Sequence, residues 1–406
     1  MARAPALPSS RPAAVRSPVA GYLAGFAFLG MALSLAGPAL PHLREQAGVG
    51  IGVSGFVLAG QSLGYILGSL AAGGRYDRGH GHRLLLGAGA VAAAAVLSLT
   101  MLHSLWLIVT AFAVVGFSSA GVDVGGNTLV VWSQPPERVG STLNALHLFF
   151  GVGALATPLL VSWSLAWTDD LTIVAVAMVA TLATVALLLR PTTAPPRRRL
   201  TAPDGEAVPS RRHPAFVLLC LFFFVYVGVE VAFAGWVSTY AEQIRLGGDD
   251  APGILASVFW AGFAGGRVVA VYVARCASLA VMLVGACVLA TAAAVALALG
   301  DGVHAVVWAT TGVVGFALGP QYATMLAFGD ERLQLSGTST SLVIASSGVG
   351  GLTLPVVTGW MLDRWGASLL PWTVGVGSLL ITGVAVATIG AGRQRPPLTS
   401  MNAPVT

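Results

Sequence analysis

The feature that most constrains this chain is a series of apolar runs, each long enough to cross a lipid bilayer. A spanning helix needs about 20 mostly apolar residues, because the hydrocarbon core is ~30 Å thick and an α-helix rises 1.5 Å per residue. Hydrophobic residues make up 56% of the 406 residues and charged residues only 9%, against roughly 25% charged residues in an average soluble protein. The sequence therefore predicts an all-α integral membrane protein.

Twelve such runs can be separated by charge clusters and by Gly or Pro. Their apolar residues are continuous rather than alternating, which favours helices over barrel strands. The first run follows an Arg-containing leader, and its length favours a retained helix over a cleaved signal peptide. The predicted spans are residues 18–40, 51–73, 84–102, 105–131, 140–163, 170–190, 215–240, 252–274, 278–299, 302–327, 336–361 and 368–390.

One long polar connection, residues 191–214, divides the runs into six and six. It is rich in Pro and Arg, cannot bury a core, and is typical of a flexible linker. The expected organisation is a tail (1–17), a six-helix bundle (18–190), the linker (191–214), a second six-helix bundle (215–390) and a second tail (391–406).

The basic residues indicate an orientation. All 21 are arginines, and most of them fall in the tails, the linker and alternate connections. The positive-inside rule then predicts that both termini are cytoplasmic, in a multi-pass protein of the cell (inner) membrane. The net charge of +5 is spread over short segments, so the lipid bilayer is expected as a partner and nucleic acid is not. We expect a monomer.

Other functional classes find little support. The three cysteines lie inside apolar runs, so neither a disulfide framework nor a thiolate metal site is expected. No connection is long enough to hold a nucleophile–base pair or a phosphate-binding glycine loop. The sequence predicts no enzyme, no cofactor and no metal.

The two halves of the chain resemble each other at a nearly fixed offset. Residues 151–158 (GVGALATP) correspond to residues 348–355 (GVGGLTLP), 197 positions later. The glycine pair Gly64 and Gly68 returns as Gly262 and Gly266, 198 positions later. Because each half has six helices, the copies share one membrane orientation and are related by an axis along the membrane normal. This pattern predicts two bundles that enclose a midplane cavity.

Residues 73–83, GGRYDRGHGHR, resemble the Gly-x-x-x-Asp-Arg-x-Gly-Arg-Arg signature of the major facilitator superfamily. The resemblance implies that family's fold, with 12 transmembrane helices as two pseudo-symmetric six-helix bundles, and secondary transport by alternating access. It also implies that Gly74, Asp77 and Arg78 belong to a cytoplasmic gate. Arg267, near the inner end of the eighth run, is expected in a gate or a structural ion pair.

A finer resemblance concerns the fucose permeases and the related glucose transporters. Residues 122–127 (VDVGGN), 144–154 (NALHLFFGVGA), 226–230 (YVGVE) and 319–324 (GPQYAT) are similar to segments in the fourth, fifth, seventh and tenth helices of that subfamily. The resemblance implies a proton-linked monosaccharide symporter.

Inserting an ionisable residue at the centre of a membrane helix is unfavourable by ~2.5–3.5 kcal/mol, so each such residue is expected to have a functional or structural role. Asp123 and Asn127 are spaced i, i+4 and share a helix face. Alternating access changes the hydration of such an acid, which can then bind a proton on one side and release it on the other. Asp123 is the first candidate for proton coupling and Glu230 the second.

Alternatives remain for these residues. Asp123 could be a structural acid bonded to Asn127 or to Arg267, and Glu230 could contact the sugar or be structural. Sodium could replace the proton if the helix were unwound at Gly125–Gly126, where backbone oxygens would join the carboxylate.

Sugar recognition needs hydrogen bonds to hydroxyl groups and an aromatic face for the C–H side of the ring. Each aromatic candidate could instead pack in the core or at the membrane interface. The predicted substrate-binding residues are Gln61, Tyr65, Asn127, Asn144, His147, Trp236, Trp260, Gln321 and Tyr322. The rival functions are a drug or metabolite exporter of the same superfamily, a sodium-coupled sugar carrier, and a membrane sensor that no longer transports.

Overall fold

The computed structural model describes residues 17–76, 78, 80–196, 214–300, 303–333 and 337–392. Within these ranges the chain is helical. The first half contains α1 (Val19–Ser34), α2 (Ala36–Gln46), α3 (Ile51–Tyr76), α4 (Gly81–Ser98), the 3-10 helix η1 (Leu99–Met101), α5 (Leu105–Ser133), α6 (Pro136–Thr168) and α7 (Thr172–Leu189). The second half contains α8 (Pro214–Gln243), α9 (Ala251–Val273), α10 (Leu279–Leu299), α11 (His304–Leu318), α12 (Gln321–Leu333), α13 (Gly337–Trp365) and α14 (Leu369–Gly392).

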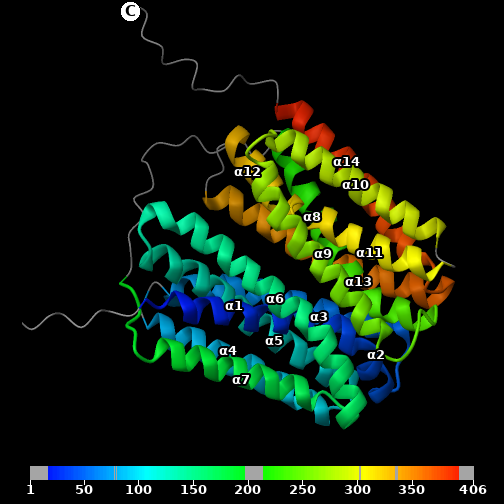
Figure 1. Ribbon diagram of the computed structural model, residues 1–406, viewed down its shortest axis with the longest axis horizontal. Helices are drawn as coiled ribbons and strands as arrows, with labels where there is room; N and C mark the ends of the chain where they lie inside the picture. The colour runs from blue at the N-terminus through cyan, green and yellow to red at the C-terminus, as the bar shows by residue number, and fades with distance from the viewer. Residues whose placement is uncertain are drawn as a thin grey trace, which may run out of the picture.

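The helices form two bundles that lie side by side (Figure 1). Helices α1–α7 pack with one another on one side, and α8–α14 pack with one another on the other side. The bundles meet where α3 packs on α13, α6 on α9, and α2 on α8. This arrangement is the predicted architecture of two six-helix bundles.

Ten helices are long and apolar enough to cross a membrane, and the bent pair α1–α2 supplies a further span. The remaining predicted span, residues 302–327, is divided between α11 and α12, and neither is long enough alone. Two of the predicted spans are therefore not single continuous helices. The first span bends by 42° between α1 and α2, and the tenth is interrupted at Gly319–Pro320.

Each interruption has a local cause. At the first, Pro38 has no N–H group to donate to the carbonyl of Ser34, and the amide of Gln61 donates to the carbonyls of Ala32 and Leu33 at 3.2 and 3.1 Å. At the second, Pro320 has no N–H group and cannot continue the hydrogen-bond ladder of α11. We call residues 318–321 the α11–α12 break.

Glycine packing repeats in both halves. A Cβ atom on Gly64 or Gly68 would collide with the backbone oxygens of α5, so only glycine allows α3 and α5 to approach so closely. Gly262 and Gly266 of α9 stand in the same relation to α11. The repeated pattern in the sequence is therefore a repeated helix contact.

Two serines join the bundles near proline kinks. The Ser62 hydroxyl of α3 donates to the carbonyl of Gly351 in α13 at 2.9 Å, four residues before Pro355. The Ser257 hydroxyl of α9 donates to the carbonyl of Leu155 in α6 at 2.9 Å, three residues before Pro158. Because Pro355 cannot donate to the carbonyl four residues before it, it frees the Gly351 carbonyl for a partner on another helix.

Some predictions lie outside the described residues. These are the tail 1–16, most of the linker (197–213), Asp77 and the tail from residue 393 onward.

Candidate functional site

The first cluster of site residues is centred on Asp123, in the middle of α5. The Tyr65 hydroxyl of α3 donates to one carboxylate oxygen of Asp123, and the Asn127 amide donates to the other at 2.8 Å. Asp123, Tyr65 and Asn127 are all half-buried. The sequence placed Asp123 and Asn127 on one helix face, and the structure brings Tyr65 to the same place.

A second cluster lies in the other bundle, around Glu230 of α8. Glu230 interacts with Arg267 of α9 and lies beside the Tyr226 hydroxyl. The Tyr226 hydroxyl donates to the carbonyl of Leu318 at 2.9 Å, and Arg267 Nε donates to the carbonyl of Gly319 at 3.0 Å. The Arg267 guanidinium also lies over the Phe263 ring, 4.4 Å from its centre. The backbone oxygens at the α11–α12 break thus take their hydrogen bonds from polar side chains of the site.

Tyr322 connects the two clusters. It is the second residue of α12, is half-buried, and interacts electrostatically with Asp123 in one bundle and with Glu230 in the other. Its ring packs edge-on against Phe223, with centroids 4.8 Å apart. Two acids, one cation and several phenols therefore face each other across the boundary between the bundles.

The other predicted substrate-binding residues fall into two groups. Asn144 and His147 of α6 are exposed, and Trp260 packs edge-on against Phe150 of the opposite bundle at 6.2 Å. His147 packs edge-on against Phe26 of α1, with ring centroids 5.7 Å apart.

The second group is held by the backbone. Besides Gln61, whose amide binds carbonyls of α1, Trp236 donates from Nε1 to the carbonyl of Pro355 at 2.8 Å and is fully buried. Gln321 donates to the carbonyl of Ala317 at 3.0 Å, and its Oε1 is buried without a partner among the described atoms.

The predicted gate is only partly visible. Arg78 is exposed, and its N–H donates to the carbonyl of Arg75 at 3.2 Å. A Cβ atom on Gly74 would have no neighbour within 4 Å. Arg267 lies with Glu230 and the α11–α12 break.

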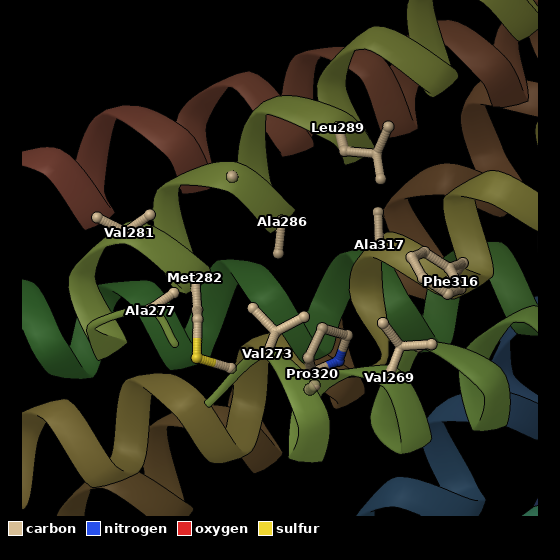
Figure 2. A pocket seen from close by; sticks show the side chains of 13 residues that line it. Val269, Val273, Ala277, Val281, Met282, Ala286, Leu289, Phe316, Ala317 and Pro320 are labelled. Atoms are coloured by element: carbon tan, nitrogen blue, oxygen red, sulfur yellow. The ribbon is translucent and has the colours of Figure 1, made fainter. Parts of the chain in front are cut away.

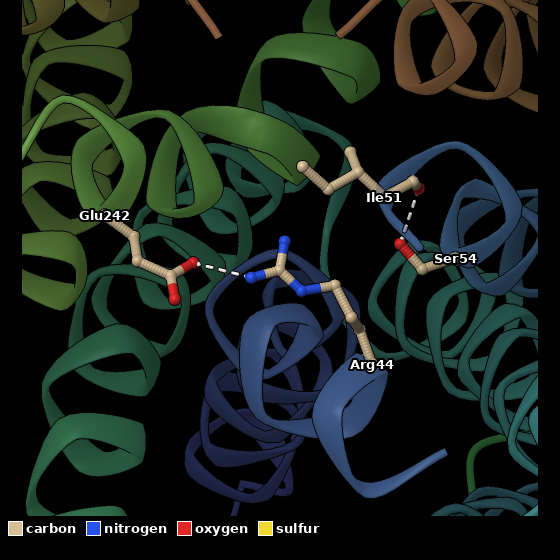
Figure 3. A network of polar contacts seen from close by, with 4 residues as sticks. All are labelled: Arg44, Ile51, Ser54 and Glu242. Atoms are coloured by element: carbon tan, nitrogen blue, oxygen red, sulfur yellow. Dashed lines mark hydrogen bonds and ion pairs between the residues drawn. The ribbon is translucent and has the colours of Figure 1, made fainter. Parts of the chain in front are cut away.

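At the opposite end, an ion pair closes the boundary between the bundles. Arg44, in the last turn of α2, contacts Glu242, in the last turn of α8, at 3.1 Å, and Figure 3 shows the two side chains pointing toward each other near the start of α3. This pair was not predicted from the sequence. The repeat offset could have found it, because Arg44 and Glu242 are 198 positions apart and so occupy equivalent places in the two halves.

The structure does not provide the unwound segment that a sodium site beside Asp123 would need. Helix α5 is continuous from Leu105 to Ser133. Gly125 and Gly126 instead make room for the rings of Tyr76 and Phe26. Among the described residues, no group of three or more His, Cys, Asp and Glu side chains could hold a metal ion.

Sequence comparisons agree with this architecture. The profile described as Major Facilitator Superfamily matches residues 22–355. The chain is 27% identical to sodium-dependent glucose transporter 1 of Xenopus laevis over 82% of this chain and 73% of that protein. It is 25% identical to the Homo sapiens protein of the same name over 92% of this chain and 80% of that protein.

Structure comparisons point to the same fold. The nucleoside transporter NupG is similar with a TM-score of 0.74 and 11% identity, over 91% of this chain and 99% of that one. A bacterial homologue of the human lysosomal transporter Spinster, in an inward-facing and unoccupied conformation, is similar with a TM-score of 0.65 and 13% identity, over 93% of this chain and 95% of that one.

Proposed function

Because the chain belongs to the Major Facilitator Superfamily, a family of membrane transporters, we propose that it is a proton-coupled monosaccharide symporter working by alternating access. It is a membrane transporter of a small solute and not an enzyme. The sugar, the coupling ion and the residue roles given below are the proposal.

The observation that carries the proposal is the environment of Asp123. Each of its carboxylate oxygens has one hydrogen-bond donor, Tyr65 or Asn127. The residue is half-buried and interacts electrostatically with Tyr322 of the second bundle. Rocking of the bundles changes the access of water to such a carboxyl group, and hydration decides whether its charged form is tolerated. Asp123 then loads a proton on one side of the membrane and releases it on the other.

The sugar binds between the two clusters in this proposal. Asn127, Asn144, His147 and Tyr322 supply hydrogen bonds to its hydroxyl groups, and Trp260 supplies an aromatic face. Glu230 shares the coupling or contacts the sugar. Gln61, Trp236 and Gln321 shape the site, since their side chains already bind backbone oxygens.

Sodium is the second candidate for the coupling ion, because the relatives named above are called sodium-dependent glucose transporters. A sodium ion wants several oxygen ligands, as other hard cations do. The intact helix around Asp123 keeps its carbonyls in the helical ladder. The carbonyls at the α11–α12 break already accept hydrogen bonds from Tyr226 and Arg267, and the charge of Arg267 repels a cation. The geometry therefore favours a proton.

We also propose that both termini are cytoplasmic, in the cell membrane. The bundles are then closed at the Arg44–Glu242 end, which faces outward. A reporter fused at Arg198, in the linker, should report a cytoplasmic location, and an external location would reverse the orientation.

Transport into proteoliposomes tests the coupling. We expect labelled glucose to accumulate when a pH gradient is imposed and not when a sodium gradient is imposed alone. Asp123→Asn keeps the size and hydrogen-bonding capacity of the side chain but removes the proton. It should abolish accumulation against a gradient while labelled glucose still exchanges for unlabelled glucose, because exchange needs no net proton release.

Two further variants make the result specific. Tyr65→Phe removes a donor and leaves the acid, so accumulation should fall only in part. Glu230→Gln should lose accumulation alone if it shares the coupling, and exchange as well if it binds the sugar. Wild-type accumulation by Asp123→Asn would remove Asp123 from the mechanism, and accumulation driven by sodium alone would favour the sodium-coupled carrier. Export of lipophilic cations without sugar-dependent proton movement would favour the drug exporter.

A further inference from the structure

A pocket lies at the side of the second bundle, away from the two acids. It has a volume of about 250 Å³ and is formed by α9, α10 and the residues around the α11–α12 break. Figure 2 shows its side chains, among them Val269, Met282, Ala286, Phe316 and Pro320. Every lining residue is apolar or glycine, so the pocket suits a hydrocarbon and not a sugar.

The first bundle closes the equivalent place. A Cβ atom on Gly121 of α5 would lie 3.1 Å from the Cβ atom of Ala88 in α4, so the two helices touch there. The residues 198 positions later are Gly319 and Ala286. Ala286 borders the pocket, while Gly319 packs closely on Phe263 of α9. The pocket thus belongs to the half in which the helix is broken.

The pocket opens toward the lipid and has the depth of one leaflet. Side chains on its rim are exposed, with 42% for Val269, 65% for Val281 and 39% for Leu289. The lining residues of α10 run from Val281 to Leu289, which is roughly 12 Å at 1.5 Å per residue. Half of the ~30 Å hydrocarbon core is a similar length.

Arg275 places a positive charge at the end of the pocket nearest the membrane surface. Arg275 is exposed in the connection between α9 and α10, between the lining residues Val273 and Ala277. Its guanidinium lies over the ring of Tyr272 at 5.3 Å. Tyr and Arg side chains at this depth lie at the headgroup level, where Arg attracts an anionic headgroup.

We propose that this pocket binds one anionic phospholipid, with an acyl chain between α9 and α10 and the headgroup phosphate at Arg275. The chain end contacts Ala317 and Pro320, at the back of the α11–α12 break. On the other side of the break, the carbonyls of Leu318 and Gly319 bind Tyr226 and Arg267. The bound lipid therefore supports the broken helix that positions these two residues.

Lipid retention tests the proposal without any transport assay. Full-length protein is purified from nanodiscs that contain phosphatidylglycerol and phosphatidylcholine with the same acyl chains, and the retained lipids are counted by native mass spectrometry. The wild-type protein should retain one phosphatidylglycerol in preference to phosphatidylcholine. Gly285→Leu fills the pocket and should reduce retention at least tenfold.

The repeat offers a matched control. Gly87 is the equivalent of Gly285, 198 positions earlier, and a Cβ atom at either residue would meet no neighbour within 4 Å. Gly87→Leu should therefore retain the lipid. Arg275→Gln should retain both lipids equally, whereas Arg83→Gln, a charge change on the first bundle, should leave the preference unchanged. Equal retention by Gly285→Leu and Gly87→Leu would overturn the pocket, and an unchanged lipid preference in Arg275→Gln would overturn the headgroup contact.

Discussion

The carbonyls of Gly121 and Gly319 occupy equivalent places in the two bundles, and each accepts a hydrogen bond from a side chain. In the first bundle the donor is the neutral Tyr76 hydroxyl, at 2.9 Å, and α5 runs through unbroken. In the second bundle the donor is the charged Arg267, at 3.0 Å, and α11 has already ended at Leu318. The repeat has therefore kept a backbone position and changed both the helix and the charge that holds it.

The position of the acidic residue also differs between the two bundles. Asp123 lies on the unbroken helix, and the residue 198 positions later is Gln321, the first residue of α12. The acid of the first bundle thus lies on a continuous helix, and the cation of the second bundle binds the backbone where the helix is interrupted.

The largest effect should come from removing the cation. Arg267→Gln leaves Glu230 without its positive neighbour and the Gly319 carbonyl without its donor. Removing one partner of a charge interaction inside the bundle leaves the other charge uncompensated, so we expect most of the transport to be lost. The equivalent residue in the first bundle is Ser69, which donates to a carbonyl of its own helix, and Ser69→Ala should retain most of the rate. Similar losses in both variants would show that the two positions do not differ in function.

A smaller effect should follow from repairing the broken helix. Pro320→Ala restores an N–H group, which can donate to the preceding turn and make the second bundle resemble the first. Because a proline inside a helix costs about 3 kcal/mol, thermal stability should rise while transport slows. The reciprocal change, Val122→Pro, should destabilise α5 by about 3 kcal/mol. Unchanged transport in Pro320→Ala would mean that the break is not needed for the cycle.

The smallest effect concerns the loops before the last helix of each bundle. Partial burial raises the pKa of Asp170, but hydrogen bonds from Thr172 and Thr168 outweigh it and leave this pKa below its usual value. The Thr172 N–H donates to Asp170 Oδ1 at 2.8 Å, as in a helix cap, so Asp170→Ala should lower the free energy of unfolding by about 0.5–1 kcal/mol.

The sign of the pH dependence follows from the lowered pKa. The contribution of Asp170 is present above its unfolded pKa of about 3.9 and is lost as the pH falls through the folded value. Thermal melts of wild type and Asp170→Ala should therefore differ at pH 7 and converge in acid. Ser368→Ala, at the equivalent place before α14, is the control, and a difference between Asp170→Ala and wild type that persisted in acid would contradict the assignment to a charged carboxylate.

Much of the fold could be predicted because continuous apolar runs of bilayer length permit only spanning helices. The two interruptions were not predicted. Pro320 and Pro38 are visible in the sequence and could have indicated a break at each place. The Gln61 amide that binds the carbonyls at the first bend comes from a different helix, and the local sequence does not predict such a contact.

The contacts of the candidate site could also be predicted only in part from the sequence. The i, i+4 spacing was enough to pair Asp123 with Asn127, since a helix places them on one face. The approach of Tyr65 and Tyr322 depends on how helices cross, which the sequence pattern does not contain. Gln61, Trp236 and Gln321 are polar or aromatic residues of the expected kind, yet their side chains bind backbone carbonyls.

The ion pair between Arg44 and Glu242 has a consequence for how this chain could arise. Two equivalent positions can touch each other only near the axis that relates the two halves. In a dimer of identical halves, the contact would bring together two arginines or two glutamates, because a two-fold interface pairs each surface with itself. Opposite charges become possible there only after duplication, when the two copies have diverged within one polypeptide. An ion pair between Arg and Glu at this end can therefore form in the fused protein but not in a symmetric dimer of identical halves.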